Sequence, residues 1–188
     1  MDVRAVADAM RELDRRDFLP DKQRPWAGED RPLTIGGGQT NSQPTTVLNQ
    51  ITLLDVHPGQ RVLDVGAGSG WTTAILARLV GPDGQVTGVE IDAELARWGA
   101  GNVAVYGMEW AALELAQPGI LGWPDSAPYD RILVSAEATE IPSSLVDQLA
   151  EDGLMVLVVN GAMLLLRREP EKEPTITQHG HYRFVPLR

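Results

Sequence analysis

The sequence contains no cysteine, and it has only three histidines among its 188 residues. Without thiols the chain has no disulfide framework, no thiolate nucleophile and no cysteine-ligated zinc site. The histidines are poorly placed for catalysis, because His57 lies in a His-Pro-Gly turn and His179 and His181 lie in a predicted C-terminal hairpin. We therefore expect a fold that is stabilised by its apolar core and a functional site without a metal ion.

Long apolar runs are missing as well. The longest, at residues 154–159 and 162–166, are far shorter than the ~20 residues of a membrane helix, and the first ten residues lack the apolar core of a signal peptide. Acidic residues outnumber basic ones by 26 to 16, which gives a net charge of -10. Phosphate backbones repel such a chain. We expect a cytoplasmic protein that binds neither nucleic acid nor membranes.

The N-terminal part of the chain contains two predicted helices and a long loop. Apolar residues recur at helical spacing over residues 2–14, which predicts an amphipathic helix. Residues 18–44 have no sustained period and contain three consecutive glycines and several prolines, so they are predicted to form an extended loop. Loops of this length in compact domains are often functional. Pro44 fits the first turn of a second helix that ends near residue 55.

Beyond residue 58, short apolar strands alternate with helical segments. This alternation predicts an α/β fold: a doubly wound, mostly parallel, Rossmann-like sheet with helices on both faces and an antiparallel C-terminal edge. We expect a single domain, 1–188, made of an N-terminal helical and loop segment (1–58) and a core (59–188). The predicted strands are 61–65, 85–91, 111–115, 131–135, 154–159, 163–168 and 182–187, and the predicted helices are 72–80, 93–106 and 143–149.

Residues 62–70, Val-Leu-Asp-Val-Gly-Ala-Gly-Ser-Gly, lead from an apolar strand into a helix through three alternating glycines. The backbone N–H groups of such a loop can approach a ligand closely. A dinucleotide fingerprint would have its third glycine at position 71, where this chain has Trp71, so a nicotinamide oxidoreductase is a distant alternative. Glu90 ends the next predicted strand, where a carboxylate can accept both hydroxyls of a ribose. The glycine-containing loop and Glu90 together fit an adenosine without phosphates.

A second carboxylate, Asp64, ends the first strand of the predicted sheet, where it can hold an amino group. Together with the glycines and Glu90 it indicates S-adenosylmethionine as cofactor. The alternative is that the glycines only make a tight turn and Glu90 is an exposed strand end. The predicted cofactor-binding residues are Asp64, Gly66, Ala67, Gly68, Ser69, Gly70, Glu90 and Ile91.

Residues 30–44, Asp-Arg-Pro-Leu-Thr-Ile-Gly-Gly-Gly-Gln-Thr-Asn-Ser-Gln-Pro, resemble the D-x-P-L-x-I-G-x-G-Q-T-I-S-x-P pattern of protein-L-isoaspartate O-methyltransferases. Shorter matches at 18–20, 121–124, 127–130, 140–142 and 183–187 follow in the right order, so the resemblance covers essentially the whole chain. It implies a Rossmann-like methyltransferase fold with S-adenosylmethionine as methyl donor. The implied reaction is methyl esterification of L-isoaspartyl residues in damaged proteins or peptides, carried out by a monomer.

The resemblance also implies roles for the loop before the second helix. Ser42 matches the family's active-site serine, and Thr40 and Gln39 match the loop that closes over the substrate carboxylate. Such a carboxylate has a pKa near ~4 and is already ionised at neutral pH, so the reaction needs positioning and desolvation and no base. We expect Ser42 and Thr40 to be the catalytic residues. The alternative for Ser42 is a helix N-cap.

Three residues depart from the family pattern. Asn41 replaces an isoleucine, Pro118 replaces an acidic residue at the adenine edge, and Glu137 lies in a stretch that the family keeps small and apolar. We expect Gln39, Asn41 and Glu137 to be substrate-binding residues. A carboxylate at position 137 would repel an anionic substrate or recruit a cationic one. These departures leave two alternatives open: a related methyltransferase with a dedicated peptide or small-molecule carboxylate, and a non-catalytic homologue that binds S-adenosylmethionine.

Overall fold

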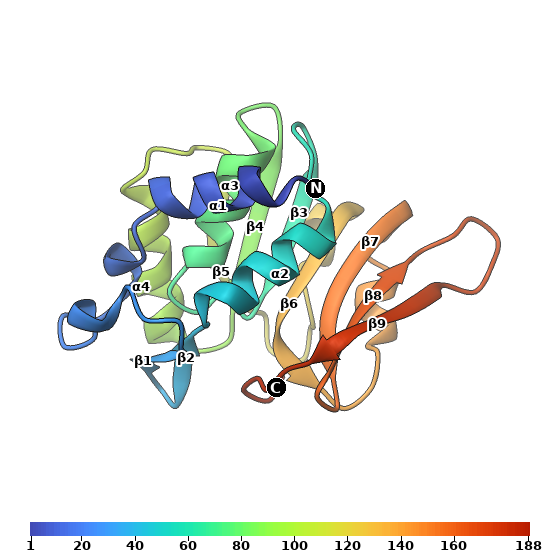
Figure 1. The fold of residues 1–188 in the computed structure, drawn as a ribbon. Coiled ribbons are helices and arrows are strands. Elements are labelled where there is room, and N and C mark those ends of the chain that lie inside the picture. Colours follow the sequence, from blue (N-terminus) through green and yellow to red (C-terminus); the bar gives the residue numbers. More distant parts are fainter.

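A computed structural model describes residues 1–188 and contains one seven-stranded sheet in the order β5-β4-β3-β6-β7-β8-β9. The first five strands of this order are parallel, and β8 and β9 are antiparallel to their neighbours (Figure 1). The predicted doubly wound α/β sheet with an antiparallel C-terminal edge is therefore confirmed. The strands are β3 (Arg61–Val65), β4 (Gln85–Glu90), β5 (Ala111–Leu115), β6 (Tyr129–Ala138), β7 (Leu149–Val159), β8 (Ala162–Arg167) and β9 (Thr175–His181).

The centre of the sheet is β3, which pairs with β4 on one side and with β6 on the other. The chain moves outward from β3 through β4 to β5 and then returns to β6. Ligands of open α/β sheets bind at the carboxyl ends of the strands where this reversal occurs. From Val62 to Val65 every residue of β3 is buried, as expected for a parallel strand covered on both faces.

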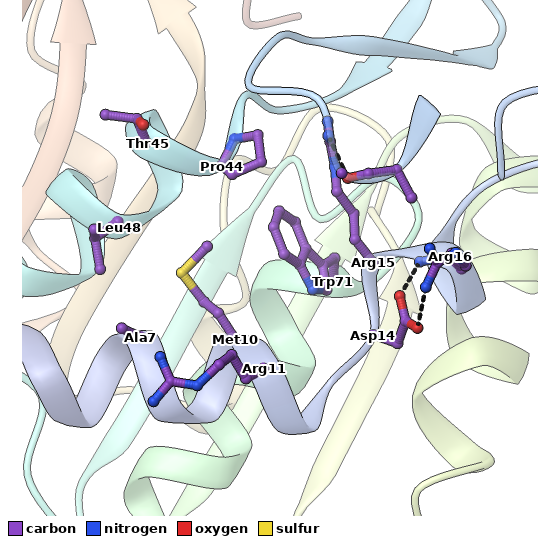
Figure 2. A pocket seen from close by; sticks show the side chains of 12 residues that line it. Ala7, Met10, Arg11, Asp14, Arg15, Arg16, Pro44, Thr45, Leu48 and Trp71 are labelled. Carbon is purple, nitrogen blue, oxygen red and sulfur yellow. Dashed lines mark hydrogen bonds and ion pairs between the residues drawn. The ribbon is translucent and has the colours of Figure 1, made fainter. Parts of the chain in front are cut away.

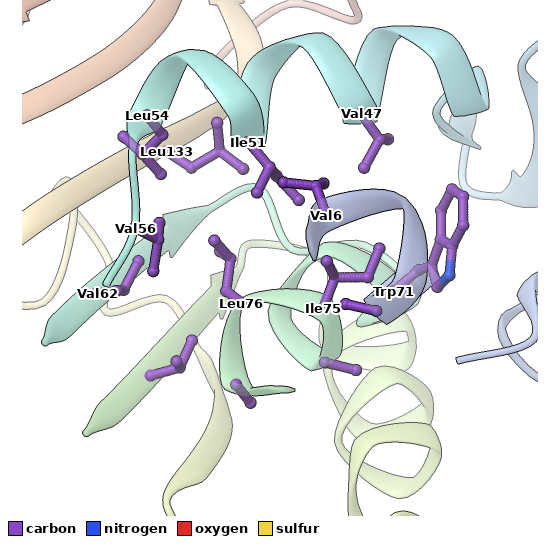
Figure 3. Close-up of a cluster of buried hydrophobic side chains, with 14 of the residues drawn as sticks. Val6, Val47, Ile51, Leu54, Val56, Val62, Trp71, Ile75, Leu76 and Leu133 are labelled. Atoms are coloured by element: carbon purple, nitrogen blue, oxygen red, sulfur yellow. The ribbon is translucent and has the colours of Figure 1, made fainter. Parts of the chain in front are cut away.

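One face of the sheet carries the long helices. The largest buried cluster joins Val6, Ile51 and Leu76 of these helices to Val62 of β3 and Leu133 of β6 (Figure 3). The division of the chain into residues 1–58 and 59–188 stays a prediction, and both segments contribute to this one cluster. The helices are α1 (Val3–Glu12), α2 (Pro44–Leu54), α3 (Trp71–Val80) and α4 (Ala93–Ala104).

The opposite face has only short helices. It is covered by residues 116–128, which include the 3-10 helix η3 (Pro124–Ser126), and by α5 (Ser143–Val146). The buried side chain of Gln148 holds the covering segment, since its amide accepts a hydrogen bond from Trp123 N at 2.8 Å and donates to Leu121 O at 2.9 Å. No helix in the chain is both long enough and apolar enough to cross a membrane.

The predicted extended loop, residues 18–44, contains regular structure that sequence reasoning missed. The 3-10 helix η1 (Arg15–Phe18) leads into this segment, which then contains a second 3-10 helix, η2 (Arg24–Trp26), and an antiparallel hairpin of β1 (Leu33–Gly36) and β2 (Gln39–Asn41). These elements are only three or four residues long, which is too short to show a period. In Figure 1 the hairpin lies at the lower end of the sheet, on the same side as the C-terminus.

The predicted strand at 182–187 is wrong. The second antiparallel strand is β9, Thr175–His181, which lies between the two strands predicted at 163–168 and 182–187. Every residue of this edge strand is exposed, so no apolar alternation marks it. Residues 182–188, the C-terminal tail, instead run back to the end of β6, where Pro186 forms a bridge with Glu137. The predicted helix at 143–149 is also shorter, because α5 ends at Val146 and Leu149 begins β7.

Candidate active site

Residues 66–70, the glycine loop, follow β3 at the carboxyl end of the sheet. Gly66, Gly68 and Gly70 have φ angles of 81°, 54° and 87°, which favour glycine. Glu90, at the end of β4, is 5% exposed, and its Oε2 accepts a hydrogen bond from Gly68 N at 2.9 Å. Its Oε1 accepts a second bond from Asp92 N at 2.9 Å. The structure thus brings the predicted carboxylate and glycines together.

A cavity of about 730 Å³ opens beside the glycine loop. This volume is typical of small-molecule sites. Glu90 lines the cavity together with Ile91, Leu115 and Ile120, three apolar side chains that are 54%, 49% and 41% exposed. A buried carboxylate suits the hydroxyls of a ribose, and the apolar side chains suit the faces of a base. The residues present therefore fit an adenosine group.

Asp64 has a different setting from the one predicted. Its carboxylate is fully buried and lines neither cavity of the site. It accepts hydrogen bonds from the hydroxyls of Thr72, Thr73 and Ser135 at 2.7, 2.8 and 3.1 Å. Burial raises the pKa of Asp64, and the three hydroxyls oppose this shift. Asp64 therefore contacts the site through Thr72 and Ser135, which both line the small cavity, and its predicted role toward a ligand's amino group stays a prediction.

Residues 39–42, the substrate loop, lie against the glycine loop. A small cavity of about 30 Å³ separates them and has room for one small group. Thr40, Asn41 and Ser42 line it from one side, and Ala67 and Ser69 from the other. Gln39 lines the large cavity only, and Gly70 lines neither. The residues common to both cavities are Thr40, Gly66, Gly68 and Ser135.

The hydroxyl of Ser42 makes no hydrogen bond within the chain, and it does not cap α2. The capping group is Asp30, whose carboxylate accepts hydrogen bonds from Thr45 N at 2.9 Å, Thr45 Oγ1 at 2.8 Å and Gln43 Nε2 at 3.0 Å. The backbone bond from Thr45, and then the two side-chain bonds, hold the pKa of Asp30 below its ordinary value. The N-cap alternative for Ser42 is therefore wrong.

Arg15 holds the substrate loop and was missed by sequence reasoning. The residue is 5% exposed, and its guanidinium donates to Asn41 Oδ1 at 2.7 Å and to the backbone oxygen of Ser42 at 2.9 Å. Burial lowers the pKa of Arg15 to about 10, against the opposing charge of Asp30, so the group is protonated at neutral pH. No carboxylate forms an ion pair with it. Further acceptors are the backbone oxygens of Ala27, Glu29, Arg31 and Asn41.

Asn41 connects this arginine to the glycine loop. Its side chain is buried, with Oδ1 accepting from Arg15 Nε and Nδ2 donating to Ser69 Oγ at 3.1 Å. Arg15 also lies over the ring of Trp71, with 5.5 Å from Cζ to the ring centroid. Figure 2 shows these two side chains side by side at the edge of an open groove of about 520 Å³ between α1 and α2. None of the predicted site residues lines that groove.

The structure places one predicted substrate-binding residue, Glu137, outside both cavities of the site. It lines neither cavity, and its carboxylate accepts a hydrogen bond from Phe184 N in the C-terminal tail. Sequence reasoning did not assign that tail to the site, yet residues 185–188 line the large cavity. Pro118 also lines this cavity, where the family pattern has an acidic residue.

Comparisons with known proteins agree with this architecture. The model of the family described as protein-L-isoaspartate(D-aspartate) O-methyltransferase matches residues 1–188. The chain is 42% identical to the protein-L-isoaspartate O-methyltransferase of Methanopyrus kandleri, over 97% of this chain and 82% of that one. It is 44% identical to the same-named protein of Anaeromyxobacter dehalogenans, over 98% and 89% of the two chains.

Two solved structures are similar over nearly the whole chain. A protein-L-isoaspartate O-methyltransferase superposes with a TM-score of 0.88 at 26% identity, covering 97% of this chain and 61% of that one. A putative protein-L-isoaspartate O-methyltransferase from Plasmodium falciparum, solved in complex with S-adenosyl-L-homocysteine, gives a TM-score of 0.86 at 23% identity and covers 100% and 92% of the two chains. At that identity the second likeness supports the fold.

Proposed function

Because the chain belongs to the protein-L-isoaspartate O-methyltransferase family, we propose that it is an S-adenosylmethionine-dependent carboxyl O-methyltransferase that esterifies L-isoaspartyl residues of damaged proteins and peptides. One observation carries this proposal. The large cavity, which fits an adenosine, and the small cavity beside Ser42 meet at Thr40, Gly66, Gly68 and Ser135. A donor in the first cavity and a carboxylate in the second would face each other across this boundary, as group transfer requires.

The large cavity supplies the groups that would hold the cofactor. Glu90 would accept hydrogen bonds from the ribose hydroxyls, and Ile91, Leu115 and Ile120 would contact the adenine. The backbone of the glycine loop would lie against the amino acid part, with Ser135 oriented by Asp64. When bound, S-adenosylmethionine provides a methyl group on a positively charged sulfur.

The substrate loop supplies the groups that would hold the acceptor. An isoaspartyl carboxylate, with a pKa near ~4, arrives ionised and is itself the nucleophile. The hydroxyls of Thr40 and Ser42 would donate hydrogen bonds to it, which orients one carboxylate oxygen and replaces part of its hydration shell. The buried guanidinium of Arg15 lies directly behind Asn41 and Ser42. Its positive charge favours an anion in the small cavity, because charges act strongly at a site with little water.

We also propose that the enzyme acts as a monomer, since one chain lines both cavities. Protein or peptide substrates follow from the family. A cytoplasmic location, and the expected lack of nucleic-acid and membrane partners, stay predictions. Two of the departures that motivated a different acceptor are engaged within the chain: Asn41 binds Arg15 and Ser69, and Glu137 binds the tail.

The decisive experiment is methyl transfer from labelled S-adenosylmethionine to a matched pair of peptides, one isoaspartyl and one aspartyl. We expect base-labile methyl ester on the isoaspartyl peptide alone. Transfer to neither peptide, with S-adenosylhomocysteine binding intact in calorimetry, would contradict the repair activity. It would favour a dedicated acceptor or a non-catalytic homologue.

Ser42→Ala tests the acceptor site at the level of one residue. Loss of a hydrogen bond to a charged group is worth about 1.5–3 kcal/mol, so kcat/KM for the isoaspartyl peptide should fall roughly 10- to 100-fold. Affinity for S-adenosylhomocysteine should change less than about twofold, because Ser42 does not line the large cavity. Ser143→Ala, at an exposed serine of α5, is the matched control. An unchanged kcat/KM in Ser42→Ala would remove Ser42 from the mechanism.

A further inference from the structure

The C-terminal tail lies beside the last residues of β6, beyond the point where β3 ends at the centre of the sheet. β3 pairs with β6 as far as Val65 and Val134 and then turns into the glycine loop. β6 continues to Ala138, so its backbone beyond Val134 no longer has β3 as a neighbour. There Glu137 N donates to Val185 O at 2.8 Å, and Leu187 N donates to Glu137 O at 2.8 Å. The tail is therefore attached at the point where β3 ends.

The side chain of Glu137 adds a third bond to the same tail, because its Oε2 accepts a hydrogen bond from Phe184 N at 3.2 Å. Beyond Tyr182, which is bound through Gly161 O, every hydrogen bond of the tail goes to Glu137. Apolar packing contributes as well, since Phe184 and Leu187 are partly buried against the two main clusters. A single residue thus makes all the polar contacts that fix residues 183–188.

The other side of this tail forms a wall of the large cavity. Residues 185–188 line it together with Glu90 and Ile91. Departure of a bound cofactor would be hindered by this wall as long as the tail stays attached to β6. We infer that Glu137 is a positioning residue that fixes the C-terminal tail against β6 and thereby slows release of the cofactor. The inference uses the cofactor site alone and is independent of which carboxylate is methylated.

The side chain and the backbone of Glu137 make separable contributions. The two backbone bonds form with any residue at 137, whereas the bond to Phe184 N needs a side-chain acceptor of the right length. Glutamine keeps such an oxygen without the charge, and alanine removes it. Glu140, three residues later, is exposed and makes no hydrogen bond. Glu140→Ala is therefore a control for loss of one negative charge near the same strand.

The experiment measures binding and dissociation of S-adenosylhomocysteine with the full chain and three variants, Glu137→Ala, Glu137→Gln and Glu140→Ala. In Glu137→Ala we expect the dissociation constant to rise about 5- to 20-fold, almost entirely through a faster dissociation rate, from the loss of one hydrogen bond to a charged acceptor. Glu137→Gln should stay within about threefold of the parent, since a neutral acceptor keeps part of that bond. Glu140→Ala should not differ from the parent.

Amide hydrogen exchange on the same proteins locates the effect. In Glu137→Ala the Phe184 and Leu187 amides should exchange faster while the amides of β3 and β6 keep their protection. Parent-like dissociation in Glu137→Ala, or a glutamine variant as defective as the alanine variant, would overturn the inference. A loss of protection throughout β3 and β6 would also overturn it, since Glu137 would then support the sheet as a whole.

Discussion

The two loops that meet at the active site are held in different ways. The glycine loop is fixed by its backbone, which lies between the ends of β3 and β4 and is bound by Val89 O and Glu90. The substrate loop pairs only with the short strand β1, and two buried side chains attach it to the rest of the chain: the guanidinium of Arg15 and the amide of Asn41, which binds Ser69. The donor side of the site is thus a property of the sheet, whereas the acceptor side depends on a short hairpin and on two polar side chains, Arg15 and Asn41. Acceptor specificity can therefore change without any change in fold.

Arg15→Met should have the largest effect, because it leaves several buried carbonyls and Asn41 without their donor. We expect the free energy of unfolding to fall by about 3 kcal/mol or more. Urea denaturation measures this loss. Arg16→Met, at the neighbouring and mainly exposed arginine, is the matched control and should cost little. Equal losses in the two variants would show that the substrate loop does not depend on Arg15.

Gly70→Ala tests the glycine loop, which is held by its backbone. A Cβ at this position would lie 2.8 Å from Val103 Cγ2 and 2.9 Å from Gly99 O, on a backbone with a φ of 87°. Strain of this kind costs about 1–3 kcal/mol before the close contacts are added. Gly107→Ala has a φ of 65° and open space around the new Cβ, so the difference between the two variants isolates the contact with α4. Equal thermal stability of both variants would contradict this close approach.

Asn41→Ile introduces the residue of the family pattern and removes the bridge between the two loops. Arg15 Nε and Ser69 Oγ lose a partner, so we expect about 1–2 kcal/mol lower stability. The KM for an isoaspartyl peptide should rise, while the affinity for S-adenosylhomocysteine should stay unchanged, because Glu90 and the glycine backbone are intact. An equal loss of cofactor affinity would mean that the two loops are not held independently.

Asp30→Ala should give the smallest effect and one that depends on pH. Hydrogen bonds at the start of α2 lower the pKa of Asp30 in the folded state, so its ionised form stabilises the fold at pH values above the unfolded pKa of about 3.9. This contribution is lost as the pH falls through the folded pKa. The Tm of Asp30→Ala should therefore be below the parent's at pH 7 and approach it below pH 4. Asp21→Ala, at an exposed aspartate that caps no helix, is the control.

The sequence predicted best the parts of the site that depend on local geometry. The glycine spacing after a strand and an acid at the end of the next strand place the glycine loop and Glu90, because parallel strands bring their carboxyl ends together. Arg15 gave no signal, since its partners lie 12 to 27 residues away and are mostly backbone oxygens. Asp64 and Glu137 looked like ligand-binding acids because a sequence does not show what will bury or bind a carboxylate.

The segment at residues 116–128 connects cofactor binding to the stability of the protein. Its Leu121 and Trp123 cover an apolar face of the sheet that lacks a long helix, while Gln117 and Ile120 line the cofactor cavity. A bound cofactor therefore rests on part of the hydrophobic core. Binding at 100 times the dissociation constant adds about 2.7 kcal/mol to the stability of any fold that only the native state can bind. We therefore expect resistance to proteolysis to rise with the concentration of the methyl donor.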